Sequence, residues 1–160
     1  MNREAIDHYA AGGEKLSLAI RGLTPQDMIC MPTDPNVGKW SIQQVVVHLL
    51  DSDLINSDRM KRIIAEDNPT LIGYDETKLA SNLHYDKQPV ADALTIFELN
   101  RKLFTIILRQ LPDSAFDRVG THNESGKMTL AQWLERTNKH LDHHLNFIHA
   151  KRAKMGKEMW

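Results

Sequence analysis

The chain has 160 residues with 41% hydrophobic and 26% charged side chains, which predicts one folded domain over residues 1–160 rather than a disordered chain. Its formal net charge of −1 implies no strongly basic face, so a nucleic-acid partner is not expected. The apolar runs are short, so no membrane-spanning segment is expected either.

Cys30 is the only cysteine in the chain. A single cysteine excludes both an intramolecular disulfide and a zinc site rich in thiolates. The N-terminus lacks the apolar core of a secretory signal. Together these features predict a cytoplasmic protein.

Proline and glycine residues divide the chain into four long helical stretches. The first is expected over about residues 2–23, although Gly12-Gly13 weakens its middle. A long, proline-rich loop follows. The second helix is expected to begin at Ser41, whose spacing from Gln44 matches a capping box. It should end near residue 66, because Asp67-Asn68-Pro69 favours a turn.

A connection over about residues 67–89 follows, with a short helix expected around residues 75–81. The third helix is predicted over about residues 90–111 and the last over about residues 129–154. No stretch shows sustained strand alternation. The predicted fold class is therefore all-α, a four-helix bundle with a long connection between helices two and three.

The last helix carries the main anomaly of the composition, since three of the eight histidines lie between residues 140 and 144. Side chains four residues apart share one helix face, separated by about 6 Å of rise, so His140 and His144 could bind one ion. His140 with His143 is the alternative pair. The apolar stripe favours the first pair, because His144 lies inside the buried arc and His140 at its edge. His143 is expected to be exposed or to lie just outside the metal ligands.

A third nitrogen ligand is expected from another helix, and His48 is the best candidate because it lies beside the apolar stripe of the second helix. The competing interpretation is an ordinary core or boundary histidine, with the last helix merely polar and rich in histidine. The histidines at positions 8, 84, 122 and 149 have no partner spacing and are expected at the surface or boundary.

Several segments, in order, carry a family resemblance. They are residues 38–52 (GKWSIQQVVVHLLDS), Arg59, Glu66-Asp67-Asn68-Pro69, Tyr74-Asp75-Glu76, Ser125-Gly126 and residues 140–148 (HLDHHLNFI). This ordered set resembles the DinB-like superfamily, and most closely its YfiT branch, which includes the bacillithiol transferases. The resemblance covers about residues 30–150.

The resemblance implies a four-helix bundle in which His48, His140 and His144 bind a metal, the same residues that the spacing selects. Water would fill the remaining coordination positions. The resemblance also implies one of two activities: transfer of a low-molecular-weight thiol onto an electrophile, or the hydrolase activity ascribed to the YfiT branch.

Three protein ligands with open positions are typical of a catalytic metal site. The expected cofactor is one divalent transition metal, zinc or nickel, although nitrogen ligands also suit iron and cobalt. The expected function is that of a metal-dependent S-transferase or hydrolase with a small-molecule substrate. The alternatives are a non-catalytic bundle that binds a metal or small ligand, and a structural bundle without metal.

Three further residues are candidates for the site. Asp51 lies one turn after His48 and is predicted to orient an imidazole or act as a base, with a solvated charge as the alternative. Arg59 falls on the same helical side and is predicted to meet a substrate carboxylate, or else to pair with a surface acid. Tyr74 is assigned to substrate binding, because it lies on the long connection where a pocket lid is expected.

Trp40 and Trp133 are interpreted as core or loop anchors rather than as platforms for a substrate. A homodimer is a further expectation, since bundles of this size often pair.

Overall fold

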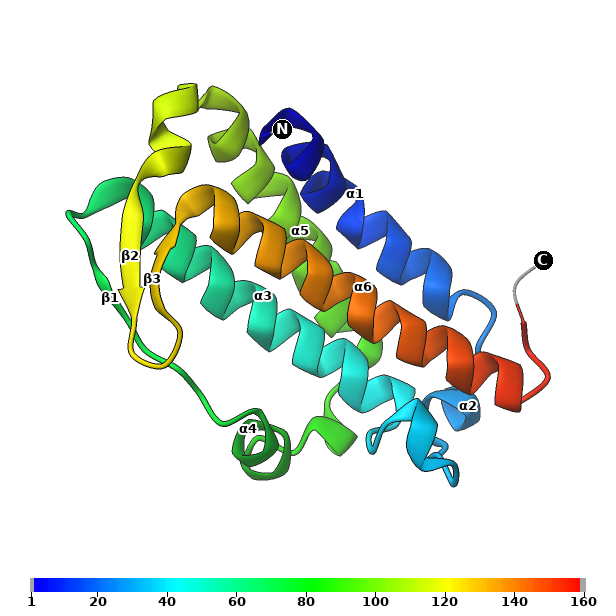
Figure 1. Ribbon diagram of the computed structural model, residues 1–160. Helices are drawn as coiled ribbons and strands as arrows, with labels where there is room; N and C mark the ends of the chain where they lie inside the picture. Colours follow the sequence, from blue (N-terminus) through cyan, green and yellow to red (C-terminus); the bar gives the residue numbers. More distant parts are fainter. Residues whose placement is uncertain (1, 159–160) are drawn as a thin grey trace.

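The computed structural model describes residues 2–158 and contains four long helices. They are α1 (Asn2–Ile20), α3 (Ile42–Ala65), α5 (Val90–Gln110) and α6 (Leu130–Lys154). Both α1 and α3 pack against α5 and α6, so the order around the bundle is α1, α5, α3, α6 (Figure 1). The predicted four-helix bundle is confirmed.

The two predicted capping boxes are present. The Ser41 hydroxyl accepts a hydrogen bond from the backbone N–H of Gln44, and the backbone N–H of Ser41 donates to the Gln44 side chain. Thr129 and Gln132 form the same two hydrogen bonds at the start of α6. Each box satisfies backbone donors that would otherwise be unpaired at the helix start. The sequence therefore located both helix starts to within one residue.

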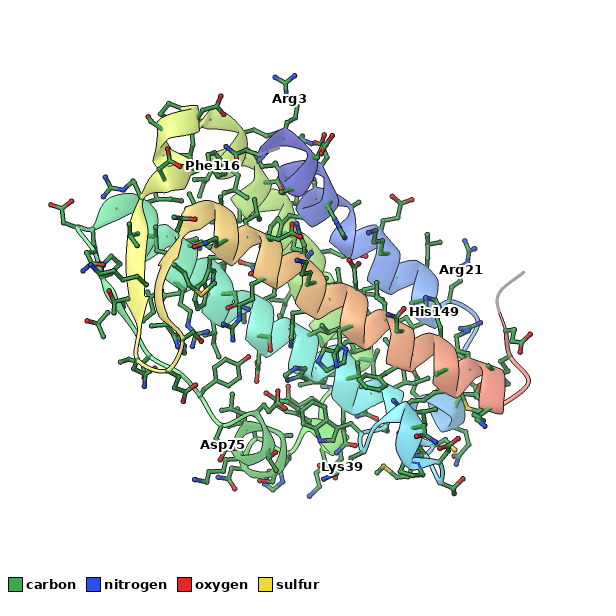
Figure 2. The ribbon with its side chains drawn as sticks, in the orientation of Figure 1. Arg3, Arg21, Lys39, Asp75, Phe116 and His149 are labelled. Atoms are coloured by element: carbon green, nitrogen blue, oxygen red, sulfur yellow. The ribbon has the colours of Figure 1, made fainter. Side chains whose placement is uncertain are left out.

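Short elements connect the long helices. These are α2 (Pro25–Ile29), α4 (Glu76–Asn82) and the 3₁₀ turns η1 (Pro35–Val37), η2 (Tyr85–Lys87) and η3 (Asp113–Asp117). Helix α4 is the short helix predicted in the long connection. Asp75 caps its start through the Lys78 backbone N–H (Figure 2).

A small sheet was not predicted from the sequence. Strand β1 (Thr70–Leu71) pairs in parallel with β2 (Val119–His122), which pairs antiparallel with β3 (Gly126–Thr129). The sheet lies at the end of the bundle where α3 ends and α6 begins (Figure 1). Strands of two to four residues are too short to show an alternating pattern, and the β1–β2 pairing joins segments about fifty residues apart.

The core consists of two apolar clusters. One centres on Val46, Leu49, Phe97 and Leu145, and the other on Tyr9, Met60, Phe104 and Trp133. The guanidinium of Arg101 lies between them, 4.3 Å from the Tyr9 ring and 4.6 Å from the Phe97 ring. Asp53 neutralises it with contacts of 2.8 and 2.9 Å. A buried ion pair thus joins the two halves of the core.

No helix within residues 2–158 combines the length and apolarity needed to cross a membrane.

Candidate metal centre

Three histidine side chains converge at the seam between α3 and α6. His48 comes from α3, and His140 and His144 lie one turn apart on α6. The Nε2 atoms of His48 and His140 are 3.2 Å apart, and the ring centre of His144 lies 4.6 Å from each of the other two. One nitrogen from each ring lies within 4.8 Å of both others. The structure therefore brings together the three histidines that the sequence selected.

The imidazoles are held in their neutral form. Burial, together with the neighbouring His140, lowers the pKa of His48 to about 3. Burial also lowers the pKa of His140 to about 4, and it lowers the pKa of His144 as well. A neutral imidazole keeps a free lone pair, which is the form that binds a metal.

The arrangement fits a transition metal ion. Two nitrogens bound to one ion at about 2.0–2.1 Å in tetrahedral geometry would be roughly 3.3 Å apart, close to the His48–His140 separation. In addition, His144 Nδ1 is buried without a hydrogen-bond partner among residues 2–158. Nitrogen donors of this kind suit divalent transition metals rather than calcium or magnesium.

Trp40 covers one side of the histidine cluster. Its ring centre lies 4.8 Å from that of His48, and it stacks on His144 at 6.4 Å with an interplanar angle of 11°. Trp40 directly precedes Ser41, the capping residue of α3, so the helix start positions the ring. Trp40, which the sequence predicted to be a core or loop anchor, therefore lies beside the histidine cluster.

Polar groups of α3 and of the long connection that follows it approach the same cluster. Ser52 Oγ lies 3.5 Å from His48 Nε2 and 2.6 Å from the Tyr74 hydroxyl. Glu76, the first residue of α4, places Oε2 3.9 Å from His48 Nε2. The sequence assigned Tyr74 to this region but missed Glu76, which is 28 positions from His48 and follows a loop of unpredictable path.

The position of Asp51 does not match its predicted contact with an imidazole. Its carboxylate instead accepts a hydrogen bond from the Tyr85 hydroxyl. One helical turn after His48, the Asp51 side chain faces η2 and not the histidines. Burial and the Asp51 carboxylate together raise the pKa of Tyr85.

The remaining histidines mostly lie where the sequence placed them. His143, His84 and His149 are exposed, and Figure 2 labels His149 on the C-terminal half of α6. His8 lies at the boundary and contacts Asp142 at 3.1 Å. His122 contradicts the prediction, because it is only 4% exposed. Its burial depends on β2 packing over Trp133, which local spacing does not reveal.

A cavity of about 190 Å³ adjoins the histidine cluster. His140 forms part of its wall, with residues from α3, the β1–α4 loop, α4, β2, the β2–β3 turn and α6: Asn56, Arg59, Gly73, Tyr74, Glu76, His122, Glu124 and Arg136. Arg59 and Tyr74, both predicted to bind substrate, lie together here, with the guanidinium 5.4 Å from the Tyr74 ring centre. The chain thus has a small polar pocket beside three converging imidazoles.

The fold and the site define a helical bundle with a three-histidine cluster suited to a metal and an adjoining pocket. The model of the DinB superfamily matches residues 5–148. The chain therefore belongs to the DinB superfamily, and its similarities place it in the YfiT branch.

Known relatives are similar in sequence over most of the chain. A protein of Oceanobacillus iheyensis named "Putative metal-dependent hydrolase" is 31% identical over 118 residues, covering 74% of this chain and 68% of the relative. A protein of the same description from Bacillus mycoides is 30% identical over 156 residues, covering 97% and 90%.

The solved structure of YfiT from Bacillus subtilis aligns with a TM-score of 0.89 at 26% identity, covering 97% of this chain and 87% of YfiT. YfiT is described as "a probable metal-dependent hydrolase with an unusual four-helix bundle topology". The structural match therefore supports the same branch as the sequence matches.

Proposed function

We propose that this protein is a metal-dependent enzyme that binds one divalent transition metal, zinc or nickel, on His48, His140 and His144. The observation that carries the proposal is the convergence of three neutral imidazoles within 4.8 Å beside an open pocket, two of them buried and that of His140 half-buried. The names of the relatives support a metal-dependent hydrolase.

A divalent ion bound here would polarise a substrate and lower the pKa of a water or thiol at its open positions. The protein would hold and orient the reactants around it. Tyr74 and Ser52 form a hydroxyl pair next to His48 that can donate or accept one proton. Glu76 is the carboxylate that would accept a proton near His48, a role first assigned to Asp51.

The pocket supports a small-molecule substrate. Its volume of about 190 Å³ lies below the roughly 300–1,000 Å³ of pockets for drug-sized ligands. Arg59 would contact the part of the substrate that points away from the histidines, and Tyr74, which lies between Arg59 and Ser52, would contact the part nearer to them. Cys30 is a free, exposed cysteine, which supports the proposed cytoplasmic location.

The first test is elemental analysis of the protein purified without a metal-affinity tag. We expect about one transition metal per chain, lost in the His48→Ala and His144→Ala variants. His143→Ala is the matched control, because it removes an exposed imidazole from the same turn of α6 and should keep the metal. A wild-type chain without metal after incubation with zinc and nickel would refute the proposal.

Two reactions would use the same site, hydrolysis and transfer of a low-molecular-weight thiol to an electrophile. Ester and amide substrates with and without an added thiol, tested on the metal-loaded protein, would separate them. Turnover that requires the thiol and consumes it would assign the transferase. Tight metal retention with no turnover in either assay would instead indicate a non-catalytic, metal-binding bundle.

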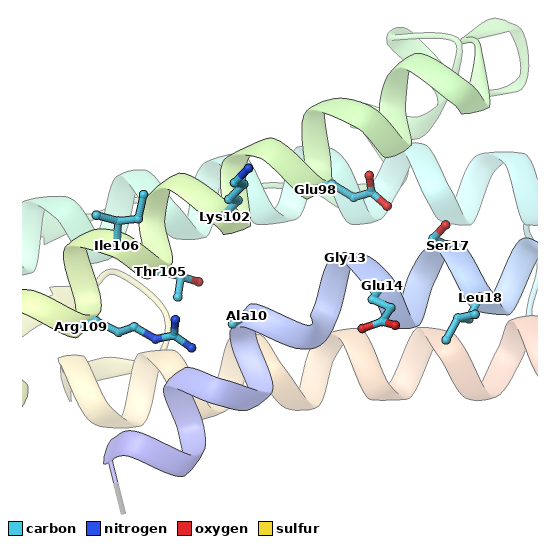
Figure 3. A pocket seen from close by; sticks show the side chains of 10 residues that line it. All are labelled: Ala10, Gly13, Glu14, Ser17, Leu18, Glu98, Lys102, Thr105, Ile106 and Arg109. Atoms are coloured by element: carbon cyan, nitrogen blue, oxygen red, sulfur yellow. The ribbon is translucent and has the colours of Figure 1, made fainter.

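We also propose that the protein forms a homodimer through α5. Five apolar side chains form an exposed stripe along this helix: Ile96, Leu99, Leu103, Ile106 and Ile107. A groove of about 610 Å³ between α1 and α5 borders the stripe, and its walls carry Glu14, Glu98, Lys102 and Arg109 (Figure 3). An apolar stripe bordered on one side by charges of both signs can pair with its own copy about a twofold axis.

A further inference from the structure

The buried arginine Arg59 lacks a counterion. It is only 7% exposed, and no carboxylate of residues 2–158 forms an ion pair with its guanidinium within 4 Å, although Asp58 and Glu124 attract it from farther away. Arg101, the buried arginine of the core, is instead paired with Asp53. A charge removed from water without a partner is costly, so an unpaired buried guanidinium beside a pocket indicates a missing anion.

The hydrogen bonds of Arg59 leave part of its donor set free. One Nη donates to the Ile72 carbonyl, and the other contacts Asn56 Oδ1 at 3.3 Å. A guanidinium has five N–H donors in a planar fork that matches the two oxygens of an oxyanion. Arg152 likewise has no carboxylate at ion-pair distance within residues 2–158, but it differs because three carbonyl oxygens accept its hydrogen bonds.

His122 supplies a second donor to the same pocket, and its tautomer follows from its contacts. The backbone N–H groups of Glu124 and Ser125 both donate to His122 Nδ1, at 3.2 Å each. Nδ1 therefore carries no proton, and the neutral ring carries its proton on Nε2. No residue from 2 to 158 accepts a hydrogen bond from Nε2, although the side chain is buried and lines the cavity.

Trp133 holds these cationic and donor groups together. The guanidinium of Arg59 lies 5.3 Å and that of Arg136 5.5 Å from the indole ring centre, and His122 lies 5.5 Å from it. Like Arg59, Arg136 has no carboxylate within ion-pair distance among the described residues; it contacts Ser125 Oγ at 3.0 Å. Two like charges on one indole repel each other, and the Glu124 carboxylate in the same pocket offsets only part of that repulsion, so a bound anion would stabilise the arrangement.

We infer that Arg59, Arg136 and His122 form an oxyanion subsite, which binds a carboxylate or phosphate group of a small substrate whose reacting group faces the three histidines. This inference rests on the proposed function for the part played by the histidines. Glu76 and Glu124 also line the pocket, but Glu76 faces His48, and the Glu124 carboxylate lies over the backbone of Gly73.

The test uses the zinc-loaded protein, with NMR of the Trp133 indole and the His122 ring. Acetate and inorganic phosphate are the probes, and acetamide is the uncharged counterpart of acetate. We expect saturable shifts with at least one anion and none with acetamide. Arg59→Gln and Arg136→Gln should each weaken anion binding at least tenfold, and Arg59→Lys should restore part of it. Arg62→Gln, which removes an exposed charge from α3, should change nothing.

Equal shifts with acetate and acetamide, or anion binding unchanged in both glutamine variants, would overturn the subsite. If Arg59→Gln fails to fold, anion binding by Arg136→Gln tests the subsite, because the Arg136 side chain is exposed and its replacement should leave the fold intact. A larger response to phosphate than to acetate would support the subsite and assign it to a phosphate group. Zinc content is measured in every sample, so the two proposals fail separately: a chain that takes up no zinc refutes the metal proposal, and anion binding by that same chain still supports the subsite.

Discussion

Gly12 of α1 lies directly against Arg101 of α5. A Cβ on Gly12 would overlap Nη1 of this guanidinium and would lie 2.8 Å from Cδ2 of Leu141. The guanidinium also donates to the Tyr9 carbonyl at 3.2 Å. Gly12 lowers the helix propensity of α1, but its missing side chain leaves the space in which Arg101 forms its buried ion pair with Asp53.

Replacement of Gly12 by alanine should destabilise the protein, although alanine is the better helix former. We expect a loss of about 1–3 kcal/mol in the free energy of unfolding, because the added methyl group must displace the arginine or separate the helices. Urea denaturation followed by circular dichroism measures it. Glu14→Ala, on the exposed side of the same helix, should stay within about 0.5 kcal/mol of wild type. A stabilised Gly12→Ala variant would show that the helices do not approach this closely.

Glu76→Gln should weaken zinc binding by about tenfold to a hundredfold, because the carboxylate 3.9 Å from His48 Nε2 adds negative charge beside the bound cation. Competition with a chromophoric chelator measures the affinity. Glu66→Gln removes an exposed charge beyond the end of α3 and serves as the control. Equal affinities in wild type and Glu76→Gln would remove Glu76 from the site.

Leu103→Lys should convert the proposed dimer to a monomer. Leu103 is 62% exposed at the middle of the α5 stripe, and two lysines facing each other across a twofold axis would repel. Analytical ultracentrifugation measures the mass. Leu83→Lys, which changes an exposed leucine outside α5, should leave the mass unchanged. A wild-type protein that sediments as a monomer at high concentration would contradict the dimer.

Lys151 should make stability depend on pH in the alkaline range. Its ammonium group is buried and donates a hydrogen bond to the Val37 carbonyl. Burial lowers the pKa of this group to about 8. The unfolded chain keeps this proton up to about pH 10.4, so the folded state bears the cost of a buried charge below pH 8 and loses that cost as the pH rises.

Relative to Lys151→Met, the wild-type protein should therefore gain stability between about pH 8 and pH 10.4, by an amount on the order of 3 kcal/mol. Urea denaturation at several pH values measures the difference. Lys154→Met, which changes an exposed lysine of the same helix, is the control. If the difference in free energy of unfolding between wild type and Lys151→Met does not change with pH, Lys151 keeps its ordinary pKa in the folded state.

Local pattern was sufficient for much of the fold and for the three histidines. The capping boxes at Ser41 and Thr129 and the apolar stripes depend on residues within a few positions of one another, where helical geometry applies directly. His140 and His144 share a face for the same reason. His48 could be chosen because its helix must turn an apolar side toward the bundle, and His48 borders that side.

Tertiary structure alone decided what surrounds the histidines. Glu76 reaches His48 through a loop, His122 is buried by a strand pairing between distant segments, and Asp51 turns to Tyr85 because η2 packs there. These contacts join residues far apart in the chain, and no periodicity within one segment encodes them. The sequence by itself thus determined the helices and the three histidines that share one seam, whereas the packing of loops and strands against α3 and α6 determined the pocket and its charge.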